Sequence, residues 1–293
     1  MIVLDGGIGR HLEKMGAPFG QPEWSALSLI QEPDFVLRAH KDFIDSGADV
    51  ITTNSYAIVP FHIGKDRFEK EGKDLLIRAG NIAKEAVKLY KKEIKIAASI
   101  PPVLGSYKPD VFNSEKAIPI LDIFKKNLIQ YCDLILAETL SSIDEVKTIQ
   151  KVFGDCKMPF WISLTIEDEY YNIPKLRSGE EIVTALRKID FNKISSVLFN
   201  CSQPEVMAKA IKVAKNLVPE NTSLGVYANA FQPIKIGQRD ANSQIRNIRQ
   251  ELTPEKYFDF VKEWNELEVD IIGGCCGIGP EHIKKICELK KNR

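Results

Sequence analysis

Cys132-Asp-Leu-Ile-Leu-Ala-Glu138 is a short, largely apolar run that ends in a carboxylate, and the residues that follow it, 143–153, have helical spacing. Four to eight mostly apolar residues in a row are typical of a strand buried on both faces, as in a parallel sheet. A helix that returns the chain to the start of the next strand completes a β/α unit. The stretch from Cys132 to Phe153 therefore predicts one such unit.

The same alternation recurs along the whole chain. The predicted strands are Ile2–Asp5, Asp49–Asn54, Ile94–Ile100, Cys132–Glu138, Phe160–Thr165, Ser195–Cys201, Ser223–Asn229 and Val269–Gly274. The predicted helices are Pro33–Ser46, Arg67–Lys92, Ser114–Tyr131, Ile143–Phe153, Gly179–Ile189, Pro204–Leu217, Thr253–Glu266 and Pro280–Lys290. Eight strand–helix pairs in 293 residues predict an α/β fold, a single (β/α)8 TIM barrel forming one domain over residues 1–293. A doubly wound sheet is the alternative.

The amino-acid composition argues against several classes of protein. Lys plus Arg and Asp plus Glu both number 40, so nothing points to nucleic acid or to an anionic membrane. No apolar stretch reaches the length of a membrane span, and the first residues lack the layout of a signal peptide. We expect a cytoplasmic protein whose six cysteines are reduced. Near-zero net charge and the polar stretch 231–251 make a homodimer a further expectation.

Three cysteines predict a metal site. Cys275 and Cys276 are adjacent and flanked by Gly273, Gly274 and Gly277, and Cys201 closes the sixth predicted strand. Neighbouring residues of a regular strand point to opposite faces, but the glycines allow the backbone to twist and come close. Thiolates select zinc or copper(I), and three protein ligands leave one position for substrate. A vicinal disulfide or three buried thiols are the alternatives.

Most predicted strands end in a polar residue, and in a barrel these ends meet at one mouth. Asp5 precedes a glycine-rich turn of the kind that can bind phosphate. An acidic residue in front of the turn would repel phosphate, so Asp5 suits a cation such as a substrate ammonium. Glu138 lies across the barrel, and the two carboxylates predict an α-amino clamp. The alternatives are a helix cap for Asp5 and a salt bridge to a neighbouring lysine or arginine for Glu138. Four histidines show no ligand spacing and are expected at the surface or in caps. The remaining polar strand ends are Asn54, Ser99, Thr165 and Asn229, of which Asn54 and Ser99 are assigned to the substrate site.

With these residues assembled, the chain resembles the homocysteine S-methyltransferase family from Met1 to about Cys287. The motifs that carry the resemblance are DGGIG at 5–9, EWSALSL at 23–29, GADVITTNSY at 47–56, ETL at 138–140, FNCS at 199–202, YANAF at 227–231 and GGCCGIGPEHI at 273–283. The family is built on a (β/α)8 barrel, in agreement with the alternation.

The resemblance implies a function for the predicted residues. It implies zinc on Cys201, Cys275 and Cys276, with homocysteine's thiolate at the open position and Asp5 and Glu138 on its α-ammonium. It also implies a possible fourth ligand, Asn229, in the absence of substrate. The chain departs from the family's sequence pattern at two places. Arg10 stands where threonine is common, and YANAF lacks the usual proline and glycine.

The methyl donor is expected to be a small onium compound: S-methylmethionine, S-adenosylmethionine or a betaine-like molecule. The EWSAL segment that contains Trp24 resembles that of the stand-alone family members that use such donors. An aromatic face also attracts a cationic donor. The other aromatic candidates in mouth loops are Tyr56, Tyr107, Tyr170 and Phe231. The alternatives are a non-catalytic homologue that binds zinc or an amino acid, and a zinc barrel hydrolase. A selenol acceptor stays open.

Overall fold

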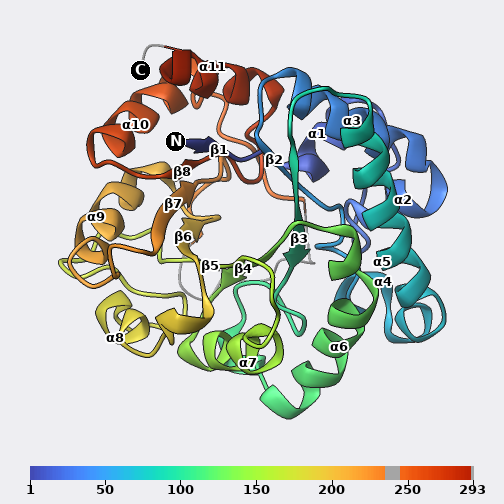
Figure 1. Ribbon diagram of the computed structural model, residues 1–293, viewed down its shortest axis with the longest axis horizontal. Coiled ribbons are helices and arrows are strands. Elements are labelled where there is room, and N and C mark those ends of the chain that lie inside the picture. The colour runs from blue at the N-terminus through green and yellow to red at the C-terminus, as the bar shows by residue number, and fades with distance from the viewer. Residues whose placement is uncertain (235–244, 292–293) are drawn as a thin grey trace.

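The computed structural model describes residues 1–234 and 245–291, and its eight parallel strands form a closed ring surrounded by helices (Figure 1). The strands are β1 (Ile2–Val3), β2 (Val50–Thr52), β3 (Lys95–Ile100), β4 (Leu134–Leu140), β5 (Phe160–Leu164), β6 (Ser196–Asn200), β7 (Ser223–Tyr227) and β8 (Ile271–Ile272). Strands β2 to β8 each pair with their neighbours in the sequence, and β1 pairs with β8. A parallel bridge between Leu4 and Val50 joins β1 to β2. The predicted (β/α)8 barrel is confirmed.

Helices alternate with the strands on the outside of the ring (Figure 1). The α-helices of the described residues are α1 (Ile8–Lys14), α2 (Ala26–Gln31), α3 (Pro33–Asp45), α4 (Pro60–Ile63), α5 (Lys65–Lys88), α6 (Ser114–Asn127), α7 (Ile143–Phe153), α8 (Ile182–Leu186), α9 (Pro204–Ala214), α10 (Pro254–Glu266) and α11 (Pro280–Lys291). Short 3₁₀ turns cover Pro109–Val111, Ile129–Tyr131 and Phe191–Lys193. Three helices were not predicted, namely α1, α2 and α4.

Aspartates explain where several strands begin. Each of three aspartates directly precedes a strand, and its carboxylate accepts a hydrogen bond from a backbone N–H of the neighbouring strand. The pairs are Asp49 with Val3 (2.9 Å), Asp133 with Ile96 (2.7 Å) and Asp270 with Leu224 (2.9 Å). Backbone donors at a strand end would otherwise lack partners, so these side chains close the N-terminal end of the barrel.

Strand β4 runs past its predicted end at Glu138. Its register with β5 shifts between Ala137 and Leu140, and Thr139 adopts a φ of 62°. The Asn200 side chain takes the place of the missing ladder partner, because its Oδ1 accepts from Thr139 N and its Nδ2 donates to Thr139 Oγ1, both at 2.9 Å. This irregularity is a bulge of the kind found at barrel rims and near functional sites.

The loop after β1 packs directly against the loop after β8. Gly7 N donates to Ile278 O (2.9 Å) and Gly274 N donates to Asp5 O (3.0 Å). A Cβ on Gly7 would lie 2.5 Å from Cys275 O, so only glycine permits this approach. The first and last β/α units are thereby joined at the mouth of the barrel. Within the described residues, none of the helices combines the length and apolar character that a membrane span requires.

Replacing Gly6 with alanine is expected to lower the free energy of unfolding by about 2–3 kcal/mol, since overpacking strains the surrounding backbone. Its Cβ would lie 2.1 Å from the backbone oxygen of Ile278. Gly20→Ala is the matched control, because nothing lies within 4 Å of a Cβ there, and its effect should stay within about 0.5 kcal/mol. Urea unfolding of both variants measures the difference, and equal midpoints would contradict the close packing of these two loops.

Candidate functional site

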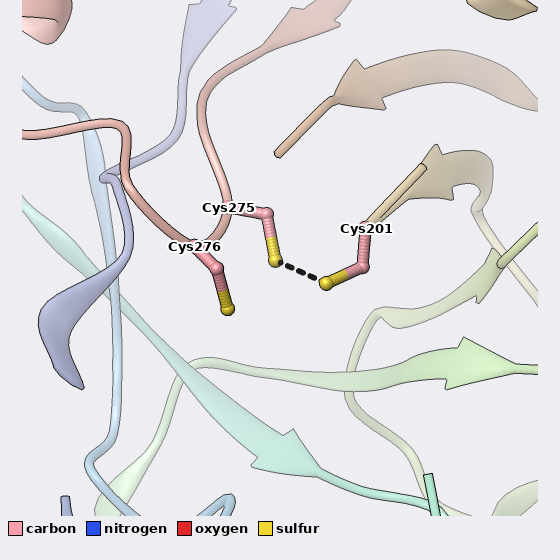
Figure 2. Close-up of side chains that lie close together, drawn as sticks. All are labelled: Cys201, Cys275 and Cys276. Carbon is pink, nitrogen blue, oxygen red and sulfur yellow. Dashed lines mark hydrogen bonds between the residues drawn. The ribbon is translucent and has the colours of Figure 1, made fainter. Parts of the chain in front are cut away.

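The sulfurs of Cys201, Cys275 and Cys276 point toward one another at the C-terminal mouth of the barrel (Figure 2). All three Sγ atoms lie within 4.8 Å of one another, and the Cys201 and Cys275 sulfurs are 3.0 Å apart. All six cysteines are free, and 3.0 Å is well beyond the ~2.05 Å of a disulfide bond. The adjacent Cys275 and Cys276 are both free, so the structure has no vicinal disulfide, one of the alternatives left open by the sequence.

Adjacent cysteines reach one point because they lie in a loop and not in a strand. Strand β8 ends at Ile272, before the pair. Cys275 N then donates to Ala228 O, and Cys276 O accepts from Ala230 N, both at 2.8 Å. Gly277 follows with a φ of 84°, a conformation that favours glycine. The flanking glycines thus serve the purpose that the sequence predicted for them.

The three thiols fit a soft, tetrahedral metal ion. Three sulfurs each ~2.3 Å from a zinc ion would be about 3.8 Å apart, which lies within the spread of the observed sulfur positions. Hydrogen bonds from the Cys275 and Cys276 thiols hold the pKa of Cys201 well below its usual range. Cys201 is thus the first of the three to become a thiolate, the form that binds metal. This trio is the only such group of potential ligands in the part of the chain that the structure describes.

The cysteines lie beside a cavity of about 920 Å³, its open mouth included. Its walls come from the ends of β1, β2, β3, β4, β6, β7 and β8, from the start of α1 and from the loop that precedes α2. Every residue that the sequence assigned to the substrate lines it: Asp5, Trp24, Asn54, Ser99 and Glu138. Thr165 and Asn229, two further polar strand ends, are buried beside the cavity and are not part of its lining.

Asp5 and Glu138 are buried carboxylates, and neither pairs with a basic side chain among the residues described. Thr52 donates to Asp5 through its backbone N–H (2.7 Å) and its hydroxyl. Glu138 accepts from Ser99 Oγ (2.5 Å) and from Tyr227 Oη (3.3 Å). Burial raises the pKa of Asp5 well above its ordinary range and raises the pKa of Glu138 to about 7. A cation that entered this space would meet two carboxyl groups that form no ion pair with any side chain of the described residues.

The alternative interpretations of these two residues do not match the structure. Helix α1 begins after Gly7 with no side-chain cap, so Asp5 is not its capping residue. Glu138 has hydroxyl partners and no lysine or arginine among the described side chains. Both carboxyl groups line the cavity, and neither a helix cap nor an ion pair with a described side chain accounts for them.

Aromatic side chains form one wall of the cavity. Trp24 packs edge-on against Phe231, with ring centroids 6.3 Å apart, and adopts a φ of 52°. Tyr56 and Tyr107 also line the space. Tyr170 does not: it is 72% exposed, and Lys209 Nζ lies 4.1 Å from its ring centroid. Asn54 completes the region near Trp24, with its Nδ2 donating to Ser25 O at 3.0 Å.

Asn229 faces the cysteine cluster with its amide nitrogen. Its Nδ2 lies 3.8 Å from Cys201 Sγ, while its Oδ1 accepts from Gln203 Nε2 and Phe231 N, both at 3.2 Å. An amide binds a metal ion through its oxygen. The ligand role of Asn229 stays a prediction. It would require the side-chain amide to flip, so that its oxygen faces the cysteine cluster.

Two of the four histidines differ from expectation. His40 and His62 are buried, at 0% and 3% exposure, and were expected at the surface or in caps. His62 reaches the cavity, and its Nδ1 donates to Pro22 O (2.8 Å). Burial lowers the pKa of His62 to about 4, so its ring is neutral. His282 does lie in the first turn of α11, where its Nδ1 accepts from Gly279 N (3.2 Å).

Several residues of the site were missed by sequence reasoning. Thr52 and Tyr227 hold the two carboxylates, and Thr139 lines the cavity at the bulge. Thr52 and Tyr227 lie within the family motifs GADVITTNSY and YANAF. A strand that is buried on both faces has no regular alternation of polar and apolar residues, so its sequence does not show which side chains face the cavity.

Comparison with known proteins agrees with this geometry. The family model described as homocysteine S-methyltransferase matches residues 2–289. The homocysteine S-methyltransferase 1 of Brassica oleracea var. italica is 28% identical over 316 residues, which cover 99% of this chain and 94% of the relative. The selenocysteine methyltransferase of Astragalus bisulcatus is 26% identical, with 98% and 91% covered. The solved structure of the homocysteine methyltransferase MmuM from Escherichia coli, in its metallated form, has a TM-score of 0.79 at 20% identity and covers 99% of this chain and 96% of its own, a likeness of fold. The chain belongs to the homocysteine S-methyltransferase family.

Proposed function

We propose that the protein transfers a methyl group from a small onium donor to the thiol of L-homocysteine and so forms methionine, with a zinc ion held by Cys201, Cys275 and Cys276. One observation supports the proposal most strongly: three thiols lie at the same cavity as two carboxyl groups that have no basic partner among the described residues. This set of groups matches a small molecule that has both a thiol and an ammonium group. Membership of the family supports the same reaction.

Asp5 and Glu138 are proposed to bind the α-ammonium of homocysteine. Thr52 holds the Asp5 carboxylate in place, and Ser99 and Tyr227 hold that of Glu138, so both are oriented before the substrate arrives. A cation placed between two ionised carboxylates makes charge-assisted hydrogen bonds, which are the stronger kind. The amino end of the substrate is thereby fixed, and its thiol is directed to the cysteine cluster.

Zinc, when bound by the three cysteines, would stabilise the thiolate form of the substrate sulfur at neutral pH. The protein's own residues would then bring the two reactants into line, which is a large part of the rate enhancement for such a transfer. The aromatic wall of Trp24, Tyr56 and Phe231 suits the positive charge of the donor. The new bond joins the homocysteine sulfur to the methyl carbon. The old bond from that carbon to the donor's sulfur or nitrogen breaks, and its electron pair leaves with a neutral product.

A zinc hydrolase fits the site less well. Such sites use histidine and carboxylate ligands with a metal-activated water. Over residues 1–234 and 245–291 the only metal-ligand group is the cysteine trio, and neutral His62 is tied to Pro22 O. A homologue that binds zinc or an amino acid without turnover has the same cysteines and carboxylates, so the assay below is what separates it from the enzyme.

The test is incubation of zinc-loaded protein with homocysteine and, separately, S-methylmethionine, S-adenosylmethionine, betaine or dimethylsulfoniopropionate. We expect methionine from at least one donor, at a rate that depends on protein concentration. Selenocysteine and selenohomocysteine belong in the acceptor panel, because a selenocysteine methyltransferase is among the relatives. Zinc binding with no methylated product from any pair would favour the non-catalytic homologue.

The pH dependence of kcat/KM for homocysteine is expected to show an acid limb near pH 7. Burial raises the pKa of Glu138 to about 7, so in the free protein its carboxyl group is neutral below that pH and cannot attract an ammonium. Binding is therefore lost as pH falls, and kcat/KM reports groups of the free enzyme. Glu138→Gln should be slow throughout, and its acid limb should move, because Asp5, whose pKa burial also raises, is then the clamp carboxyl group left to titrate. An acid limb that is unchanged in Glu138→Gln would assign the titration to another group.

A further inference from the structure

Cys201 differs from the other two cysteines in its hydrogen-bond partners. Tyr107 Oη donates to its sulfur at 2.8 Å, and Asn229 Nδ2 approaches it at 3.8 Å. Among residues 1–234 and 245–291, the hydrogen-bond partners of the Cys275 and Cys276 sulfurs are other cysteines. The proposed zinc site is thus asymmetric, with one thiolate that is hydrogen-bonded by the protein.

Tyr107 is held in place by a buried cation. Its backbone has a φ of 62°, and the guanidinium carbon of Arg177 lies 5.2 Å from the centroid of its ring. Arg177 is fully buried and forms two hydrogen bonds with the Asp168 carboxylate, at 3.0 and 3.1 Å. A buried charge of this kind is tolerated only when it is paired, and Asp168, together with Glu167 at 3.7 Å, supplies the opposite charge.

The same ion pair also holds the backbone that carries Cys201. Arg177 Nη2 lies 3.5 Å from Cys201 O, and Asp168 accepts from the backbone N–H of Gln203 at 2.9 Å. Cys201 itself has a φ of 52°, which is unusual for a residue other than glycine. Arg177 and Asp168 therefore contact both sides of one hydrogen bond: the tyrosine that donates it and the loop whose sulfur accepts it.

We infer that Tyr107 and Arg177 are positioning residues for the Cys201 thiolate, a role that rests on the proposed zinc site. The Tyr107 hydroxyl stabilises negative charge on the sulfur, because hydrogen bonds to charged acceptors are stronger than neutral ones. Arg177, paired with Asp168, keeps the Tyr107 hydroxyl and the loop that contains Cys201 aligned for this hydrogen bond. The outer partners of metal ligands orient them in this way and influence affinity for the metal.

Tyr107→Phe tests the inference, because it removes the hydroxyl and keeps the ring over Arg177. We expect its affinity for zinc, measured by competition with a chelator, to fall about 10-fold. In the cobalt(II)-substituted protein the sulfur-to-metal charge-transfer band should move to lower energy, since the Cys201 lone pairs lose their donor. Arg177→Lys should weaken zinc binding in the same direction, and if it does not fold, Tyr107→Phe alone decides.

Tyr227→Phe is the matched control, since it removes another buried hydroxyl of the same cavity whose partner is Glu138 and not a sulfur. It should leave the charge-transfer band and the zinc affinity unchanged. If the Tyr107→Phe band and affinity equal those of the parent protein, the positioning role is wrong and the proposed function stands. If the parent protein itself binds no metal through its cysteines, the proposed function fails as well. The two failures are therefore distinguishable.

Discussion

Cys275→Ser is expected to remove most of the bound zinc and to lower kcat/KM for methyl transfer by about 1000-fold. A serine hydroxyl is a hard, weakly acidic ligand, so only two thiolates would be left to hold a soft metal ion. A loss of about 4 kcal/mol in stabilisation of the reacting sulfur corresponds to this factor. Zinc content after dialysis and the rate of methionine formation measure the two effects.

Cys156→Ser is the control for cysteine chemistry in general. Cys156 is a free, half-buried cysteine in the turn between α7 and β5, away from the cavity lining. We expect it to keep the zinc content and activity of the parent protein. If Cys275→Ser kept both as well, the cysteine cluster would have no part in the reaction.

Asp5→Asn and Glu138→Gln are each expected to lower kcat/KM for homocysteine about 100-fold, or about 2.7 kcal/mol. Each substitution keeps the shape and the hydrogen-bond acceptor of the side chain but removes its negative charge from a buried site, where truncating one member of a charge pair is costly. The zinc content should not change, because neither residue belongs to the cysteine cluster. Steady-state kinetics with metal analysis of the same samples measures both.

An analogue of homocysteine without its amino group shows whether this loss comes from the α-ammonium. In the parent protein 4-mercaptobutyrate should be a much poorer acceptor than homocysteine. In Asp5→Asn and Glu138→Gln the difference between the two acceptors should shrink, because the carboxylate that recognises the ammonium is gone. An undiminished preference for homocysteine in both variants would assign the ammonium to other residues.

Much of the barrel could be predicted because its strands are buried on both faces and read as short apolar runs. The positions of Asp49, Asp133 and Asp270 show why strands begin where they do. Strand ends were harder, since they depend on long-range partners: the Asn200 side chain holds Thr139, which lies 61 residues earlier in the chain and just past the predicted strand end at Glu138. The helices α1, α2 and α4 are short pieces inside connecting loops, where helical periodicity has too few turns to be seen.

The candidate site was predictable where chemistry is concentrated in motifs. The cysteines, Asp5 and Glu138 stand out by residue type, and the barrel explains why they meet. Tyr107 and Arg177 could not be assigned to Cys201 in the same way, because the contact between Tyr107 and Cys201 spans 94 residues and depends on the fold of two loops. The burial of His40 and His62 was missed for a similar reason, since a lone histidine carries no periodic signal.

Zinc K-edge X-ray absorption of the zinc-loaded protein, recorded with and without selenohomocysteine, tests the central claim most directly. Selenium scatters more strongly than sulfur, so a selenium atom bound to zinc is distinguishable from the cysteine ligands. We expect three sulfur neighbours in both samples and one selenium neighbour when the acceptor is present. Fewer than three sulfur neighbours, or no selenium in the zinc shell at a saturating concentration of the acceptor, would contradict the central claim.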